Sequence, residues 1–220
     1  MRNLLDQGLD EINNDLIEMG TLIEIAIDRA ITALKTKDRE LAKSVKKYEK
    51  QVEALEKKIE RTSLQVLVSQ QPVARDLRLI SVALKLITDM QRIADQAANI
   101  AGITKFLVDT DSVKNIDLLI EMASKTISMV NKSLDSFINK DMELAEFVID
   151  NDDEVDELFV AVRDELVNLI NQDKNTGAEA IDLVMIAKYL ERIADHAVNI
   201  SNWVIFYITG EHRHPIEEEE

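Results

Sequence analysis

An internal repeat constrains the fold of this chain more than any other feature of its sequence. The segment K-D-R-E-L-A-K-S-V at residues 37–45 is matched by K-D-M-E-L-A-E-F-V at residues 140–148. Further along, R-I-A-D-Q-A-A-N-I at residues 92–100 is matched by R-I-A-D-H-A-V-N-I at residues 192–200. The matched segments keep their order and their approximate spacing, which predicts two copies of one structural unit.

The first unit has the pattern of three helices. Apolar residues recur at intervals of three and four over residues 16–34, which is typical of an amphipathic helix. Asp38 occupies the position of an N-cap for a second helix, which we expect to run to about Gln70. A third helix, with Pro72 in its first turn, is expected to end near Val108.

The second unit repeats this pattern, with a break at residues 172–177 and a stop at Gly210. We therefore expect two three-helix repeats, at residues 1–110 and 111–210, followed by a polar acidic tail at residues 211–220. Helices of this length joined by short connections pack up and down. The predicted fold is all-α, with two tandem antiparallel three-helix bundles and six long helices, packed side by side or end to end.

Composition narrows the classes of function. The 220 residues contain no cysteine, which excludes disulfides and thiolate chemistry and fits a reducing, cytoplasmic compartment. The formal net charge of −16 disfavours nucleic acid as a partner, because phosphate binding relies on clustered Lys and Arg. No apolar run approaches the roughly 18 residues that a membrane span requires, so we expect no membrane insertion.

The charges are distributed unevenly between the repeats. Basic side chains gather over residues 35–61, whereas the counterpart at residues 141–165 is almost purely acidic. A solvated helix face explains such a stretch most simply. The alternative is a surface for a partner or for self-association, in which the basic stretch of one chain pairs with the acidic stretch of another.

The third helix of each unit carries polar residues beside its apolar stripe. Glu191 and Asp195 are four residues apart and therefore share one helix face. The first copy has Gln91 and Asp95 in the same places. Two carboxylates at this spacing repel each other, so a pair near a core needs a compensating cation.

The second helix of each unit contributes further acids at the same spacing, and these meet the first set if the two helices pack together. Clusters of oxygen ligands suit Mg, Mn, Fe or Ca, so we expect divalent or iron-type metal ions. The alternative is a helix face stabilised by Arg–Asp ion pairs. The eight candidate metal ligands are Glu49, Glu53, Gln91, Asp95, Asp152, Asp156, Glu191 and Asp195.

No constellation of catalytic residues is readable. A Ser–His–acid set and a glycine-rich phosphate loop are both missing, and the sequence has only 5 glycines. A Glu-x-x-His spacing occurs once, from Glu211 to His214 in the expected tail, whereas a ferritin-like di-iron bundle needs two on inward-facing helices. We therefore expect a protein that is not an enzyme.

Three segments together resemble the PhoU family of phosphate-transport accessory proteins. They are Q-Q-P-V-A-R-D-L-R at residues 70–78, L-E-R-I-A-D-H-A-V-N-I at residues 190–200 and Y-I-T-G-E-H-R-H at residues 207–214. The resemblance covers nearly the whole chain, including the tandem repeat. A generic coiled coil would not combine P-V-A-R-D-L-R with two copies of R-I-A-D.

The resemblance implies a function beyond what spacing shows. PhoU-like proteins are tandem three-helix bundles, commonly homodimers, that bind metal through repeated Glu/Asp-x-x-x-Asp motifs. They are negative regulators of the phosphate regulon, thought to couple the ATPase of a phosphate ABC transporter to a sensor histidine kinase. The resemblance thus implies a homodimeric, cytoplasmic, metal-binding adaptor with these two partners.

The two copies of the motif are unequal. Glu191 and Asp195 match the family pattern, whereas Gln91 replaces an acid in the first copy. We expect the second copy to bind metal more tightly, unless Asp89 or the acids of the second helix substitute in the first. Two alternatives remain: a carboxylate-bridged metalloenzyme, and a metal-free structural helical module.

Overall fold

The computed structural model describes residues 2–110, 113 and 116–213, and within these ranges the chain contains helices and no strand. The first repeat forms α1 (Arg2–Thr36), α2 (Arg39–Gln70) and α3 (Arg75–Leu107). The second repeat forms α4 (Asp117–Asn139), α5 (Met142–Asp150), α6 (Asp152–Gln172) and α7 (Gly177–Thr209), with a short 3-10 turn at Lys174–Thr176. The all-α prediction is confirmed.

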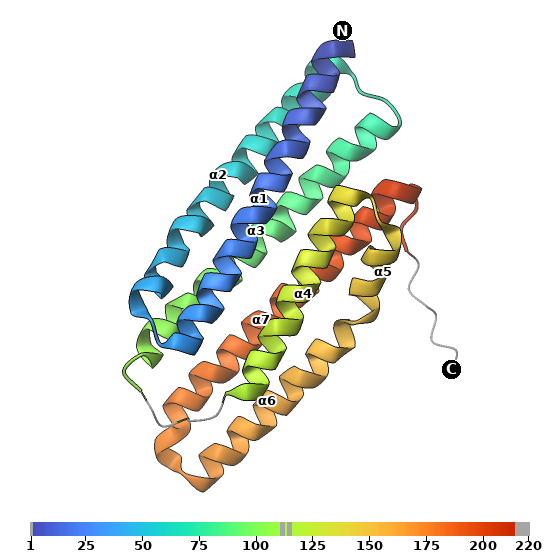
Figure 1. Ribbon diagram of the computed structural model, residues 1–220. Helices are drawn as coiled ribbons and strands as arrows, with labels where there is room; N and C mark the ends of the chain where they lie inside the picture. Colours follow the sequence, from blue (N-terminus) through green and yellow to red (C-terminus); the bar gives the residue numbers. More distant parts are fainter. Residues whose placement is uncertain (1, 111–112, 114–115, 214–220) are drawn as a thin grey trace, which may run out of the picture.

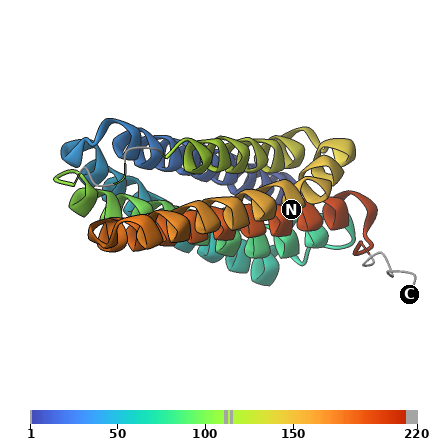
Figure 2. The same cartoon turned by 90° about the horizontal axis from the view of Figure 1, so that it is seen from below.

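The two bundles lie side by side (Figure 1). Within each bundle the three helical rods pack against one another, and the bundles join where α3 packs along α7 and α1 packs against α4. In the view from below, α1 and α4 run along the same side of the molecule (Figure 2). No helix in the described ranges is long and apolar enough to cross a membrane.

The R-I-A-D segments, residues 92–100 and 192–200, form the middle of the joint between α3 and α7. Their apolar residues follow a helical period, so they fall on one face and enter the core. Each of these side chains is at most 1% exposed: Ile93, Ala94, Ala97, Ile100, Ile193, Ala194, Ala197 and Ile200.

The K-D segments make the same turn in both repeats. Lys37 and Lys140 adopt left-handed backbone conformations, with φ of 52° and 54°, and each ends a helix. Asp38 then caps α2 by accepting hydrogen bonds from the backbone N–H groups of Glu40 and Leu41, which confirms the predicted N-cap. Asp141 caps α5 by accepting a hydrogen bond from the backbone N–H of Leu144.

The start of α3 differs from the prediction. Pro72 lies before the helix rather than in its first turn, because α3 begins only at Arg75. Proline disfavours right-handed helical geometry in the preceding residue, and Gln71 is left-handed with φ 49°. Ala74 also has a positive φ of 49°, which delays the start of the helix.

The middle rod of the second repeat is broken, whereas its counterpart α2 is continuous. Asn151 leaves helical geometry between α5 and α6, and its side-chain amide donates to the carbonyl of Phe147 at 2.8 Å. Three acids follow in the first turn of α6, where the positive end of the helix dipole favours them. The predicted break at residues 172–177 and the stop at Gly210 are confirmed.

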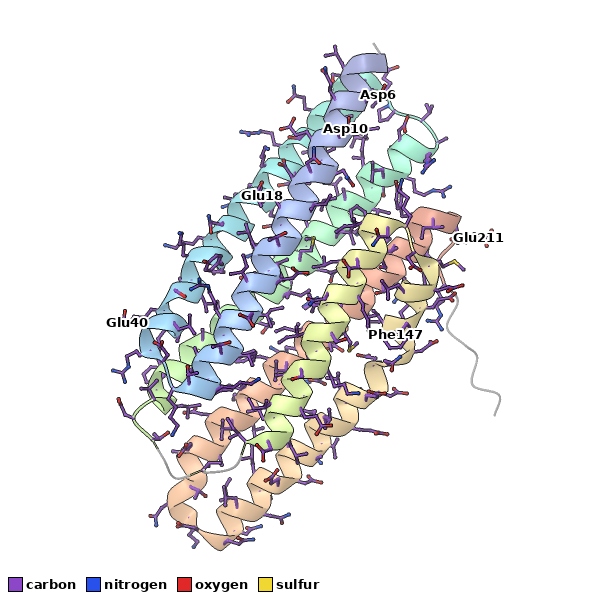
Figure 3. The ribbon with its side chains drawn as sticks, viewed as in Figure 1. Asp6, Asp10, Glu18, Glu40, Phe147 and Glu211 are labelled. Atoms are coloured by element: carbon purple, nitrogen blue, oxygen red, sulfur yellow. The ribbon has the colours of Figure 1, made fainter. Side chains whose placement is uncertain are left out.

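Charged side chains cover the outside of the bundles. Asp6, Asp10, Glu18 and Glu40 project from the outer faces of α1 and α2 (Figure 3). Several lysines of the basic stretch on α2 form ion pairs within their own helix, as Lys43 does with Glu40 and Lys57 with Glu53. Such exposed pairs stabilise a helix only weakly.

Replacing Asp38 with alanine is expected to lower the free energy of unfolding by about 1 kcal/mol, because two backbone N–H groups lose their acceptor. Urea unfolding followed by circular dichroism measures this change. Asp38→Asn is the matched control, since an asparagine cap removes the charge and keeps an acceptor. Equal losses in both variants would assign the effect to charge rather than to capping.

Candidate functional site

The second cluster, which we define as Asp152, Asp156, Glu191 and Asp195, joins two helices. Asp152 and Asp156 lie one turn apart on α6, and Glu191 and Asp195 lie one turn apart on α7. The helices pack against each other, and the charge of acids on the facing helix raises the pKa of each aspartate of the cluster. The structure thus brings all four predicted residues together.

Burial and mutual repulsion make this cluster electrostatically unfavourable. Burial raises the pKa of Asp152 to about 6, and the charges of Asp156 and Asp195 add to the rise. Burial also raises the pKa of Asp195, with Glu191 as the next cause, and it raises the pKa of Asp156 in the same way. A bound cation would relieve both effects at once.

Among the described residues, only one acid of the second cluster has a cation within ion-pair distance. Lys188 forms an ion pair with Glu191, one turn away on α7. In the described part of the chain, no ion pair or side-chain hydrogen bond reaches Asp152, Asp156 or Asp195. The cluster therefore carries a negative charge that the fold leaves largely uncompensated.

The first cluster, which we define as Glu49, Glu53, Gln91 and Asp95, joins α2 and α3. Burial raises the pKa of Asp95, followed by the charge of Glu49, with a smaller effect of Glu53. The side-chain amide of Gln91 donates to Asp95 at 3.0 Å. The structure therefore brings these four predicted residues together as well.

The first cluster is neutralised more fully than the second. Lys46 Nζ lies 2.5 Å from Glu49 Oε1, and Lys57 Nζ lies 2.6 Å from Glu53 Oε1. Arg92 reaches Asp95 at 3.8 Å. Glu49 Oε2 is nevertheless buried without a hydrogen-bond partner among the described residues, so an acceptor remains for a further ligand.

The structure adds one acid that the sequence analysis missed. Glu56 lies on the same face of α2 as Glu53, and its pKa is raised by burial, then by the charges of Glu60 and Asp95. The sequence does contain the pattern that points to Glu56, because acids recur at intervals of three and four residues beyond Glu53. The equivalent position in the second repeat holds Phe159, which explains why repeat comparison did not reveal it.

Asp89 does not belong to the first cluster, although it was considered as a substitute ligand there. It crosses the joint between the bundles, where its carboxylate lies 2.9 Å from His196 Nδ1 and 3.3 Å from Asn199 Nδ2. These contacts connect α3 to α7. The further acid beside the first cluster is Glu56, whose pKa the charge of Asp95 helps to raise.

Neither cluster is an assembled coordination shell. Among the residues that the structure describes, no three His, Cys, Asp or Glu side chains stand in an arrangement that could hold a metal ion. The residue chemistry still fits a hard cation, because carboxylate oxygens converge from two helices and several of them lack a partner. Coordination requires these side chains to rotate toward one another.

The second cluster should make the metal-free protein less stable as the pH rises. Because the pKa of Asp152 is raised from 3.8 to about 6, its protonated form stabilises the fold below pH 4, and that contribution is lost through pH 6. We expect a loss of about 1 kcal/mol between pH 4.5 and 7, after allowing for solvent screening.

Urea unfolding in the presence of a chelator measures this loss. Asp152→Asn should flatten the pH dependence, whereas the exposed acid changed in Glu165→Gln, further along α6, should leave it as in the wild type. The same pH dependence in all three proteins would contradict the electrostatic account of the cluster.

Comparison with known proteins identifies the repeat. The family model described as the PhoU domain matches the chain twice, at residues 16–104 and 119–204. A PhoU homolog of the phosphate-specific transport system from Aquifex aeolicus is 37% identical, over 98% of this chain and 99% of its own length. A homolog from Clostridium acetobutylicum is 32% identical, over 95% of this chain and 96% of its own length.

Solved structures agree with these sequence matches. The crystal structure of PhoU from Pseudomonas aeruginosa superposes with a TM-score of 0.90 at 30% identity, over 94% of this chain and 99% of that one. The phosphate transport system regulatory protein PhoU from Streptococcus pneumoniae has a TM-score of 0.88 at 24% identity, covering 96% and 100% of the two chains. The latter match supports the fold alone.

Proposed function

The chain belongs to the PhoU family, and we propose that it is a metal-binding regulatory adaptor of phosphate uptake. Its relatives are accessory proteins of phosphate transport systems, which supports a role in the regulation of phosphate transport rather than an enzymatic activity. The finer parts of the proposal are metal binding, the identity of the partners and negative regulation of the phosphate regulon.

The single observation that carries the metal proposal is the second cluster. Asp152 is half-buried and Asp156 and Asp195 are exposed, and all three have raised pKa values and no cation within ion-pair distance in the described residues. A chain that maintains this repulsion on two packed helices gains stability from a divalent cation. The residues of both clusters supply oxygen ligands, which suits Mg, Mn, Fe or Ca.

We propose that the second cluster binds metal more tightly than the first. In the first cluster Lys46, Lys57 and Arg92 already neutralise three acids, and Gln91 is uncharged. In the second cluster only Glu191 has such a partner within the part of the chain that the structure describes. An incoming cation therefore meets a stronger negative potential at the second cluster.

Isothermal titration with Mn²⁺ tests metal binding on chelator-treated protein. Changing Glu191→Gln and Asp195→Asn together should abolish the tighter binding event, because two of four oxygen donors lose their charge. The control Asp164→Asn with Glu165→Gln removes two exposed charges from α6 and should leave binding intact. Unchanged Mn²⁺ binding in the variant with both cluster changes would contradict metal binding at the second cluster.

The proposed partners are the ATPase of a phosphate ABC transporter and a sensor histidine kinase, contacted in the cytoplasm. Exposed apolar side chains on neighbouring helices, among them Val167 on α6 and Ile181 on α7, offer contact surface for a partner or a second copy. The basic α2 and the acidic α6 add complementary charge for a homodimer.

Affinity capture of the tagged protein from phosphate-replete cells of its source is expected to recover the transporter ATPase and the histidine kinase. Deleting the gene should raise expression from a phosphate-regulon promoter in phosphate-rich medium, and the wild-type gene should restore repression. Full repression without the gene would contradict negative regulation.

Two other classes of function give different outcomes. A carboxylate-bridged metalloenzyme would turn over oxygen or phosphate esters when loaded with metal. A metal-free structural module would show no Mn²⁺ binding and no change of stability with chelator. The names of the relatives favour the regulatory role over both.

A further inference from the structure

Each acidic cluster holds a lysine of its own chain at its edge. Lys46 contacts Glu49 across one turn of α2, and Lys188 contacts Glu191 across one turn of α7. In both pairs the lysine precedes the acid by three residues. The cluster in each repeat is therefore occupied by a built-in ammonium group in the metal-free protein.

The two lysines do not occupy equivalent positions in the two repeats. The position equivalent to Lys46 in the second repeat is Ile149, and the position equivalent to Lys188 in the first repeat is Thr88. One lysine reaches its cluster from the second helix of its repeat, and the other from the third. Lysines at non-equivalent positions therefore reach equivalent clusters. The presence of a lysine follows from the acidic cluster and was not inherited with the repeat.

The lysines of these pairs are more exposed to solvent than their acids, so each lysine can leave its acid and a metal ion can take its place. The side chains of Lys46 and Lys188 are 59% and 38% exposed, whereas those of Glu49 and Glu191 are only 12% and 17% exposed. Each lysine can leave its acid by rotating into water, without opening the core. Phe159 lies beside Lys188 Nζ, with 5.4 Å between the nitrogen and the ring centre, and helps to hold the ammonium group in place.

We propose that Lys188 and Lys46 are resident counter-ions that a divalent cation must displace, and that they thereby set the metal affinity of the two clusters. This inference rests on the proposed metal binding. Lysine and metal compete for the same carboxylate oxygens, because Lys188 contacts Glu191 and also acts electrostatically on Asp156 and Asp195. Metal binding then releases a positive side chain to the surface of α7.

Titration of the full-length chain with Mn²⁺ tests this competition at the second cluster. A background of Glu49→Gln with Asp95→Asn disables the first cluster, so that one site remains. In this background Lys188→Met should tighten Mn²⁺ binding roughly tenfold, because the competing unit charge is gone and the apolar stem is kept. Lys188→Arg, which keeps the cation, should stay close to the background protein.

Lys174→Met is the matched control, since it removes one exposed lysine beyond the end of α6 and changes the net charge equally. Affinity in Lys188→Met that equals the affinity in Lys174→Met would overturn the inference while leaving metal binding in place. If neither the background protein nor Lys188→Met binds Mn²⁺, the metal proposal itself fails, and this inference fails with it.

Thermal unfolding gives a second, independent readout. Without metal, Lys188→Met should melt below its background protein, because Glu191 loses its counter-ion. With saturating Mn²⁺ the two proteins should melt at nearly the same temperature, since the metal then neutralises the cluster in both. A melting difference that persists unchanged with Mn²⁺ would make Lys188 a purely structural residue and overturn its role as a displaced counter-ion.

Discussion

The packing of α3 along α7 is the contact on which the rest of the structure depends. The two helices carry the buried isoleucines and alanines of both R-I-A-D segments, and their packing joins the two bundles. The same segments carry Asp95 and Asp195, which lie next to buried residues in the chain but belong to the flank of each helix. Burying the apolar face therefore brings carboxylates to the edge of the core.

That placement has an electrostatic consequence in each repeat. Carboxylates lose part of their hydration and stand close to acids of the neighbouring helix, so their charged forms are disfavoured. The fold offsets this cost with lysines in both repeats, and in the first repeat also with Arg92 and the amide of Gln91. The second cluster retains more unpaired charge, which makes it the better candidate for a metal ion.

The two repeats have kept their backbone architecture while their polar residues diverged. Glu191 corresponds to Gln91, and Phe159 corresponds to Glu56, so a charge lost on one helix is matched by a charge gained on the other. The joint between the bundles has become asymmetric as well, because Asp89 meets His196 there. The chain is therefore a tandem repeat in its fold and a pair of distinct sites in its chemistry.

The sequence by itself determined the helices, the duplication and the residues that would form the two clusters. Helical period, the Asp38 cap and the Gly210 stop are local properties, and the matched segments required no structure to be seen. Only the tertiary structure decided that the bundles lie side by side, that Asp89 faces His196 and that Glu56 joins the first cluster. It also decided which lysine reaches which acid, since such contacts depend on side chains brought together by packing between helices rather than by order along the chain.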